Sequence, residues 1–157
     1  MLAIADNLKN LLKGKVLILG VGNRMKGDDG AGPAVVDKIA GRISADCFDA
    51  GVAPENYLEK VAGLKPDTVL LVDAVSFGGK PGEIRLIAPE QIVAGGLSTH
   101  VPSLQMAAEY LKARISATTL IAGIQPESLK LGDGLSEAVS KAVDSLADAL
   151  LEVLGRK

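Results

Sequence analysis

The sequence predicts an α/β fold, a three-layer sandwich in which helices cover both faces of a mostly parallel, twisted sheet of about five strands. Short apolar runs alternate along the chain with segments of helical spacing, as they do in successive β-α units. The run DTVLLVD, residues 67–73, is apolar on both faces, which is typical of a central parallel strand. No repeat or linker interrupts the 157 residues, so we expect a single domain over residues 1–157.

Residues 1–13 predict an additional N-terminal amphipathic helix. Four apolar side chains fall at helical spacing in this stretch: Ile4, Leu8, Leu11 and Leu12. The early Asp6 and the absence of a basic region before the apolar residues argue against a secretory signal. We expect the helix to pack on the domain, and an arm that docks a partner is the alternative.

The other elements follow in order along the chain. Strands are expected at residues 15–20, 45–49, 67–73, 82–87 and 117–124, and helices at 32–43, 54–64, 101–114 and 135–154. Pro33 and Pro54 stand in the first turns of two of these helices, where proline is tolerated. The last helix carries one continuous apolar stripe, which predicts core packing: Leu135, Val139, Val143, Leu146, Leu150 and Val153.

Composition excludes several classes of function. The formal net charge is −2 and no long basic run occurs, which argues against nonspecific binding of nucleic acid or anionic lipid. No apolar run approaches the roughly 20 residues that span a bilayer, so membrane insertion is not expected. The single cysteine, Cys47, cannot form an intramolecular disulfide, and a buried inert thiol in a cytoplasmic protein is expected. We expect the protein to be a monomer.

The loop GVGNRMKGDDGAG, residues 20–32, lies between a strand and a helix, where many α/β proteins bind phosphate. The dinucleotide fingerprint fails because Met25 stands where its third glycine is required. Gly22 and Gly27 have the spacing of a P-loop, but Asp28 and Asp29 replace its lysine and hydroxyl residue. A carboxylate at ~4 Å would repel a phosphate by roughly 1 to 4 kcal/mol. The loop therefore suits a cation or a proton-transfer role.

Two further polar residues are expected at the same edge of the sheet. Asp73 ends the predicted strand 67–73, and functional crevices of such sheets lie outside the carboxyl ends of the strands. His100, the only histidine, lies in the loop-like segment GGLSTHVPSL. Two carboxylates and one imidazole would form an open three-ligand site for Ni, Zn or Co. A turn-capping role for Asp73 and a structural role for His100 are the alternatives.

Other common hydrolytic and metal motifs are missing. No G-x-S-x-G turn supplies a serine nucleophile, and neither H-E-x-x-H nor C-x-x-C occurs. Three ligands with a single histidine would by themselves hold a metal only loosely. A self-contained zinc enzyme is therefore not favoured.

The glycine loop, the strand end LLVDAV and the segment STHVPSL, in this order, resemble the [NiFe]-hydrogenase maturation endopeptidases. The resemblance extends through DAGVAPEN, PGEIR and GIQPES, and so covers nearly all of the chain from Lys15 onward. GIQP and the PEN turn resemble the branch that serves formate-hydrogenlyase-type and related membrane-bound hydrogenases. The chain departs from the family in its additional N-terminal helix and in Ala50, where glycine is common; neither touches the proposed ligands.

The resemblance implies an aspartyl-type hydrolase that removes a C-terminal extension from the hydrogenase large-subunit precursor after nickel insertion. It implies that Asp29, Asp73 and His100 contact the nickel, and that Asp29 or Asp73 is the catalytic base. Asp28 and Asn23 are secondary candidates. Nickel would be contributed by the substrate, already held by cysteines of the precursor, and no tightly bound metal is expected in the isolated protein.

Three alternatives remain open from the sequence. A peptidase of the same fold could process another precursor, as a spore-germination-type protease does, without any dependence on nickel. A nickel-binding accessory protein without proteolysis could use the same three residues. A small-molecule-binding α/β domain is disfavoured because both phosphate fingerprints fail.

Overall fold

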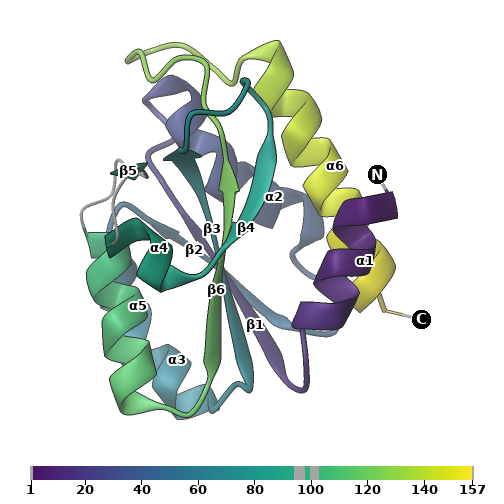
Figure 1. The fold of residues 1–157 in the computed structure, drawn as a ribbon, viewed down its shortest axis with the longest axis vertical. Helices are drawn as coiled ribbons and strands as arrows, with labels where there is room; N and C mark the ends of the chain where they lie inside the picture. The colour runs from purple at the N-terminus through teal and green to yellow at the C-terminus, as the bar shows by residue number, and fades with distance from the viewer. Residues whose placement is uncertain (1, 94–97, 100–102, 157) are drawn as a thin grey trace.

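The computed structural model describes residues 2–93, 98–99 and 103–156, and its centre is one sheet (Figure 1). The strand order is β2-β1-β3-β6-β4. The first four of these strands run parallel: β2 (Asp46–Gly51), β1 (Val16–Val21), β3 (Thr68–Ser76) and β6 (Thr118–Ile124). At one edge β4 (Ile84–Ile87) pairs antiparallel with β6, and the short β5 (Ser98–Thr99) pairs antiparallel with the end of β3.

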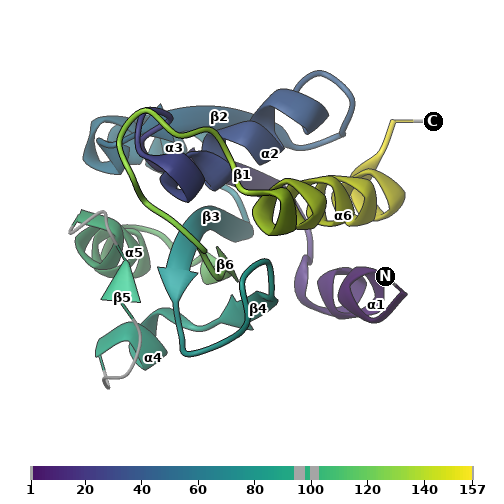
Figure 2. The ribbon, with the colours of Figure 1, turned by 90° about the horizontal axis from the view of Figure 1, so that it is seen from above.

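Helices cover both faces of the sheet, which confirms the predicted three-layer α/β fold (Figure 2). On one face lie α1 (Leu2–Leu11), α2 (Ala31–Ile39) and α6 (Glu137–Leu154). The other face is covered by α3 (Leu58–Leu64) and α5 (Ser103–Arg114). Side chains alternate along β3, so that Leu70 and Val72 belong to the first core cluster and Leu71 to the second.

The amphipathic helices pack as their spacing predicts. The middle of the α6 stripe is fully buried, from Val139 to Leu150, because this face lies on the sheet and on α2. The N-terminal helix is present as α1 and packs against α6, with Ile4, Leu8 and Leu12 buried. Leu11 differs from the expectation, because it is 39% exposed at the end of α1.

Several boundaries differ from the predicted ones. The helix expected over 32–43 ends at Ile39, because Ala40 has an extended backbone (ψ 130°). The strand expected over 67–73 continues to Ser76, and the helix expected over 54–64 begins with the 3₁₀ turn η2 (Pro54–Tyr57) before α3. Three short elements were not predicted, namely the 3₁₀ turn η1 (Gly27–Gly30), α4 (Pro89–Val93) and β5.

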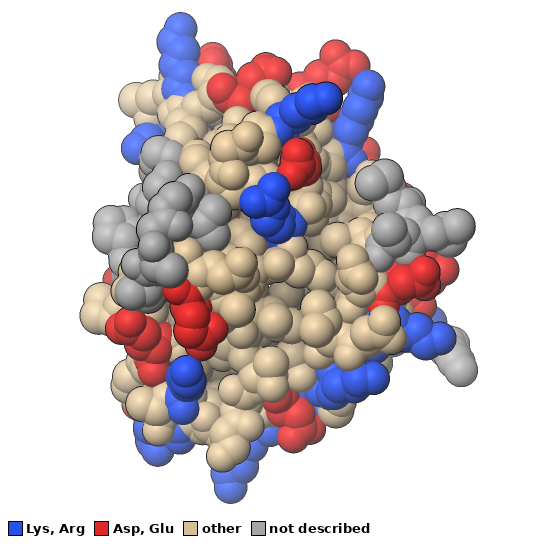
Figure 3. Space-filling view, in the orientation of Figure 1, with Lys and Arg blue, Asp and Glu red and all other residues tan. Residues whose placement is uncertain are grey.

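The face of the molecule on which β4 lies carries a broad area without charged side chains (Figure 3). A cavity of about 440 Å³ opens beside β4, where Ile4 of α1, Ile84 of β4 and Ala142 of α6 contribute to its wall. None of the residues that line this cavity is one of the predicted site residues. Within the described residues, no helix has the length and apolar character needed to cross a membrane.

Candidate active site

The acidic loop is shaped by close contacts that only glycine permits. Gly22 directly follows β1 with φ of +144°, and a Cβ on it would lie 1.9 Å from the carbonyl oxygen of Asp29. Gly32 lies in the first turn of α2, where a Cβ would lie 2.2 Å from the carbonyl oxygen of Val72 in β3. The loop and η1 are therefore packed tightly on the carboxyl ends of β1 and β3.

Asp29 is 3% exposed and only half of its carboxylate is hydrogen-bonded. Its Oδ2 accepts a 2.9 Å hydrogen bond from the backbone N–H of Asn23. Its Oδ1 is buried and has no hydrogen-bond partner among the described residues. Buried polar atoms are nearly always paired, so this oxygen is one that a proton, a water or a metal could engage.

Asp28 is completely buried, and its carboxylate is occupied by the segment 125–136 between β6 and α6. It accepts hydrogen bonds from the backbone N–H groups of Glu127 (2.8 Å), Ser128 (3.1 Å) and Ser136 (2.7 Å), and from Ser136 Oγ (2.9 Å). The Asp28 N–H also donates to the carbonyl oxygen of Ser128 at 2.8 Å. Asp28 therefore joins the acidic loop to a distant part of the chain.

Asp73 is completely buried within β3, not at its end as the sequence suggested. The strand continues because Asp73 and Ala74 still pair with β6, opposite Gly123 and Ile124. The Asp73 Oδ1 accepts a 2.8 Å hydrogen bond from the Ala74 N–H. By alternation Asp73 lies on the α3/α5 face of β3, and the η1 turn that contains Asp29 packs against the same strand.

His100 lies outside the described residues, so its meeting with Asp29 and Asp73 stays a prediction. The described parts of its segment are the start of α5 and β5, in which Thr99 pairs with Val75, two residues after Asp73. Across the described ranges, no three His, Cys, Asp or Glu side chains form a group that could hold a metal ion.

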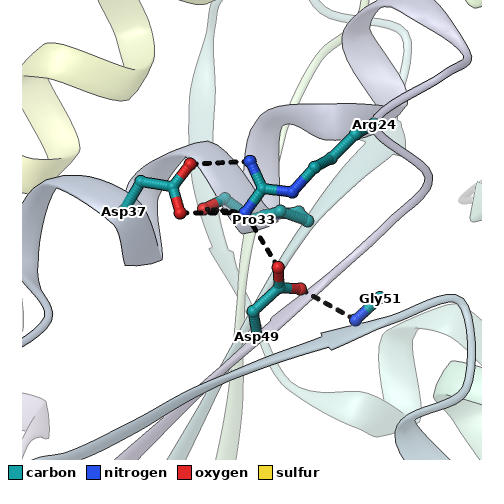
Figure 4. Close-up of polar contacts among 5 residues, drawn as sticks. All are labelled: Arg24, Pro33, Asp37, Asp49 and Gly51. Carbon is teal, nitrogen blue, oxygen red and sulfur yellow. Dashed lines mark hydrogen bonds and ion pairs between the residues drawn. The ribbon is translucent and has the colours of Figure 1, made fainter.

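Arg24, which was not predicted as a site residue, ties the acidic loop to two other elements (Figure 4). Its guanidinium donates to both carboxylate oxygens of Asp37 in α2, at 2.6 and 2.8 Å. It also donates to Asp49 Oδ2 in β2 at 2.8 Å, while Asp49 Oδ1 accepts from the Gly51 N–H. These hydrogen bonds raise the pKa of Arg24 and lower the pKa of Asp37. Arg24, which directly follows Asn23, thus connects this part of the acidic loop to α2 and β2.

Gln125, in the GIQP segment, is a second residue whose role the sequence did not show. Its Oε1 accepts hydrogen bonds from the backbone N–H groups of Phe77 (2.8 Å) and Gly79 (3.2 Å). It therefore holds the turn that follows β3, just beyond Asp73. The resemblance of GIQPES to the family was the only signal that could have drawn attention to it.

Cys47 lies in β2 and is partly buried. Burial raises the pKa of its thiol to about 11, because the thiolate would lose its hydration. The thiol is therefore protonated at neutral pH and poorly reactive, as the sequence predicted.

Comparison with known proteins places this chain in a family. Residues 33–153 match the HycI family, described as hydrogenase maturation protease. The hydrogenase 3 maturation protease of Escherichia coli K12 is 35% identical over 137 residues, which cover 85% of this chain and 87% of that protein. The crystal structure of the [NiFe] hydrogenase maturation protease HycI from Thermococcus kodakarensis KOD1 matches with a TM-score of 0.85 and 32% identity, covering 94% of this chain and 98% of that chain. The solution structure of the Escherichia coli endopeptidase HycI gives a TM-score of 0.74 at 31% identity, covering 86% and 88%. The chain therefore belongs to the hydrogenase maturation protease family and is a hydrolase of that class.

Proposed function

We propose that this endopeptidase removes the C-terminal extension of a [NiFe]-hydrogenase large-subunit precursor after nickel has been inserted. The observation that carries the proposal is the unpaired Oδ1 of Asp29. Asp29 belongs to the buried η1 turn, which packs against β3, the strand that also holds the buried Asp73. A substrate that brings a cation to this edge of the sheet would give Asp29 the partner that it lacks.

In this proposal the nickel belongs to the substrate, and the protease recognises only precursor that carries it. Asp29, Asp73 and His100 supply at most three ligands, one of them an imidazole, which suits a borderline metal such as nickel but leaves its coordination incomplete. Precursor cysteines supply the remaining ligands. The metal is then held at the site only when the loaded precursor is bound, and the isolated protein retains none.

The hydrolytic step needs one carboxylate to act as a base. A water molecule gives its proton to Asp29 or Asp73 and attacks the scissile carbonyl carbon, and the proton then passes to the leaving amine. The nickel or a nearby backbone N–H stabilises the negative oxygen of the intermediate. Contact between the fixed carboxylates and the substrate's metal positions the scissile bond, an effect that contributes on the order of 7 to 11 kcal/mol at best.

The experiment compares two forms of the same substrate. The protein is mixed with nickel-loaded and with nickel-free large-subunit precursor, and the masses of all chains are measured. Shortening of the loaded precursor alone is the expected result. Shortening of both forms would indicate a peptidase that does not read nickel, and shortening of neither would indicate an accessory protein. Nickel titration of the isolated protein adds a second test, because a carrier would retain the metal.

The enzyme is proposed to act as a cytoplasmic monomer. Its one cysteine cannot form an intramolecular disulfide, which suits a reducing compartment. Light scattering during size-exclusion chromatography measures the molar mass in solution, and a dimer would contradict the second part of this proposal.

A further inference from the structure

We propose that three exposed apolar side chains around the Asp29 turn form a docking surface for the precursor. These residues, which we call the apolar rim, are Met25, Val52 and Leu131. Met25 and Leu131 are each 69% exposed, and Val52 is 58% exposed. The inference rests on the proposed function, because it assigns a surface to the same substrate.

Met25 and Leu131 are exposed on backbone that is fixed. The Gly132 N–H donates to the carbonyl oxygen of Met25 at 2.9 Å, and Lys26 forms an antiparallel bridge with Leu131. The segment between β6 and α6 therefore runs beside the acidic loop, as both ribbon views show (Figures 1 and 2). The hydrogen bonds to Asp28 hold this segment on both sides of Leu131. Because this backbone is already ordered, binding a partner here would cost little conformational entropy.

Val52 is attached to the other side of the same loop. It follows Gly51, the last residue of β2, whose carbonyl oxygen accepts a 2.8 Å hydrogen bond from the Gly22 N–H. The acidic loop that carries Asp29 is thus bonded to both neighbouring segments that carry the rim. Asp29 itself is close to Met25, since its N–H donates to the carbonyl oxygen of Lys26 at 3.1 Å.

The other large apolar side chains that are exposed in the described residues lie on helices. They are Met106 in α5 and Leu11 in α1. Leu11 precedes the start of β1, which places it toward the amino ends of the parallel strands, whereas the rim lies at their carboxyl ends. Scattered exposed apolar residues are ordinary, but one on the acidic loop and two on segments bonded to it indicate a contact surface.

The chemistry of the rim points to a protein surface with apolar side chains beside its metal. The exposed charged neighbours have both signs, with Lys26 and Lys130 against Glu127 and Asp133. Neighbours of mixed charge do not favour a strongly charged partner, so we infer that apolar contact with the rim residues supplies the affinity. The flexible thioether of Met25 adapts to the shape of the surface that it meets. The occupant we infer is therefore an apolar patch of the folded precursor next to the nickel site.

The test measures initial rates of processing against the concentration of cognate nickel-loaded precursor. For the double variant Met25→Ser/Leu131→Ser, we expect KM to rise by about tenfold or more with kcat nearly unchanged. Leu11→Ser removes a less exposed apolar side chain (39%) at the other end of the strands, and its KM should equal that of the wild type. Met25→Leu keeps apolar area at the rim and should also retain the wild-type KM. Thermal unfolding of each variant establishes that the fold is kept.

The outcomes separate this proposal from the proposed function. If the wild type cleaves and the double variant keeps its KM, or loses kcat alone, the rim is not a docking surface. An equal rise in KM for Leu11→Ser would also overturn it. If the wild type does not cleave, binding of the precursor is measured by calorimetry instead, to Asp29→Asn protein with and without the two serine substitutions. An unchanged Kd would show that the rim is not a docking surface. A weaker Kd in the protein with the serines would support the proposal.

Discussion

Asp28 and Asp29 are neighbours in one 3₁₀ turn and both are buried, yet their carboxylates are bonded in opposite ways. Asp28 accepts four hydrogen bonds from the segment that leads into α6. Asp29 accepts one, from the Asn23 N–H, and its Oδ1 has no partner within the described part of the chain. A fully hydrogen-bonded carboxylate and a half-bonded one thus stand side by side.

The two aspartates should respond differently to substitution. Asp28→Ala leaves three partly buried N–H groups without their acceptor and empties a buried position, so we expect the free energy of unfolding to fall by about 3 kcal/mol. Asp29→Asn keeps an acceptor for the Asn23 N–H, so we expect a change below about 1 kcal/mol together with loss of processing. Urea unfolding and a precursor-processing assay measure the two effects. Full activity of Asp29→Asn would remove Asp29 from the mechanism.

Replacing Gly22 should disturb the site through the backbone. In Gly22→Ala the new methyl would overlap the carbonyl oxygen of Asp29 and the residue would have to keep a positive φ. We expect unfolding free energy to fall by about 2 to 4 kcal/mol and processing to slow, because Asp29 must shift. Gly134→Ala is the matched control, since no atom lies within 4 Å of a Cβ at that position. Equal effects at both positions would show that the close contact at Gly22 is unimportant.

Removing the Arg24 side chain should affect activity more than stability. Arg24 is 48% exposed, so its ion pairs contribute about 0.5 to 1 kcal/mol. Arg24→Met frees the loop at Asn23, the residue that positions Asp29, and we expect kcat/KM to fall by about tenfold. Lys38→Met removes an ion pair from a lysine of the same helix as Asp37, also 48% exposed, without touching the loop. If this control loses as much activity, the effect is not specific to the loop.

Cys47 should resist alkylation in the folded protein. With a pKa of about 11, only about 0.1% of the thiol is ionised at pH 8, against roughly a quarter of a free cysteine. Iodoacetamide labelling followed by mass spectrometry should therefore be more than tenfold slower for native than for urea-unfolded protein. The same shift lowers folding stability as the pH rises from about 8.5 toward 11, because the unfolded thiol ionises first. Rapid native labelling would contradict the assigned burial.

The buried helices and strands were predicted well from the sequence, because apolar side chains recur along them at strand or helix spacing. The apolar runs of β1, β3 and β6 and the stripe of α6 match the observed elements within three residues. The end of β3 was misplaced, because the pattern of side chains does not reveal that β6 and β5 continue the backbone pairing beyond Asp73. The five-residue α4 is too short to show a helical period.

The site was predicted only in part, because its contacts join distant positions. The resemblance to the family separated Asp29 from Asp28, but the hydrogen bonds that Asp28 forms with the segment 125–136 could not be predicted from the sequence. Arg24 reaches partners 13 and 25 residues away, so no local motif contains the interaction. His100 lies outside the described residues, and its place beside the two aspartates stays a prediction.

Ser136 has a second role besides its bonds to Asp28, because its Oγ accepts a 3.3 Å hydrogen bond from the Val139 N–H and so caps α6. Asp28 and Ser136 are 108 positions apart, so these hydrogen bonds can form only in a chain that extends at least to Ser136. One serine therefore completes both the acidic turn and the start of α6, so that a change at Ser136 would disturb the two together.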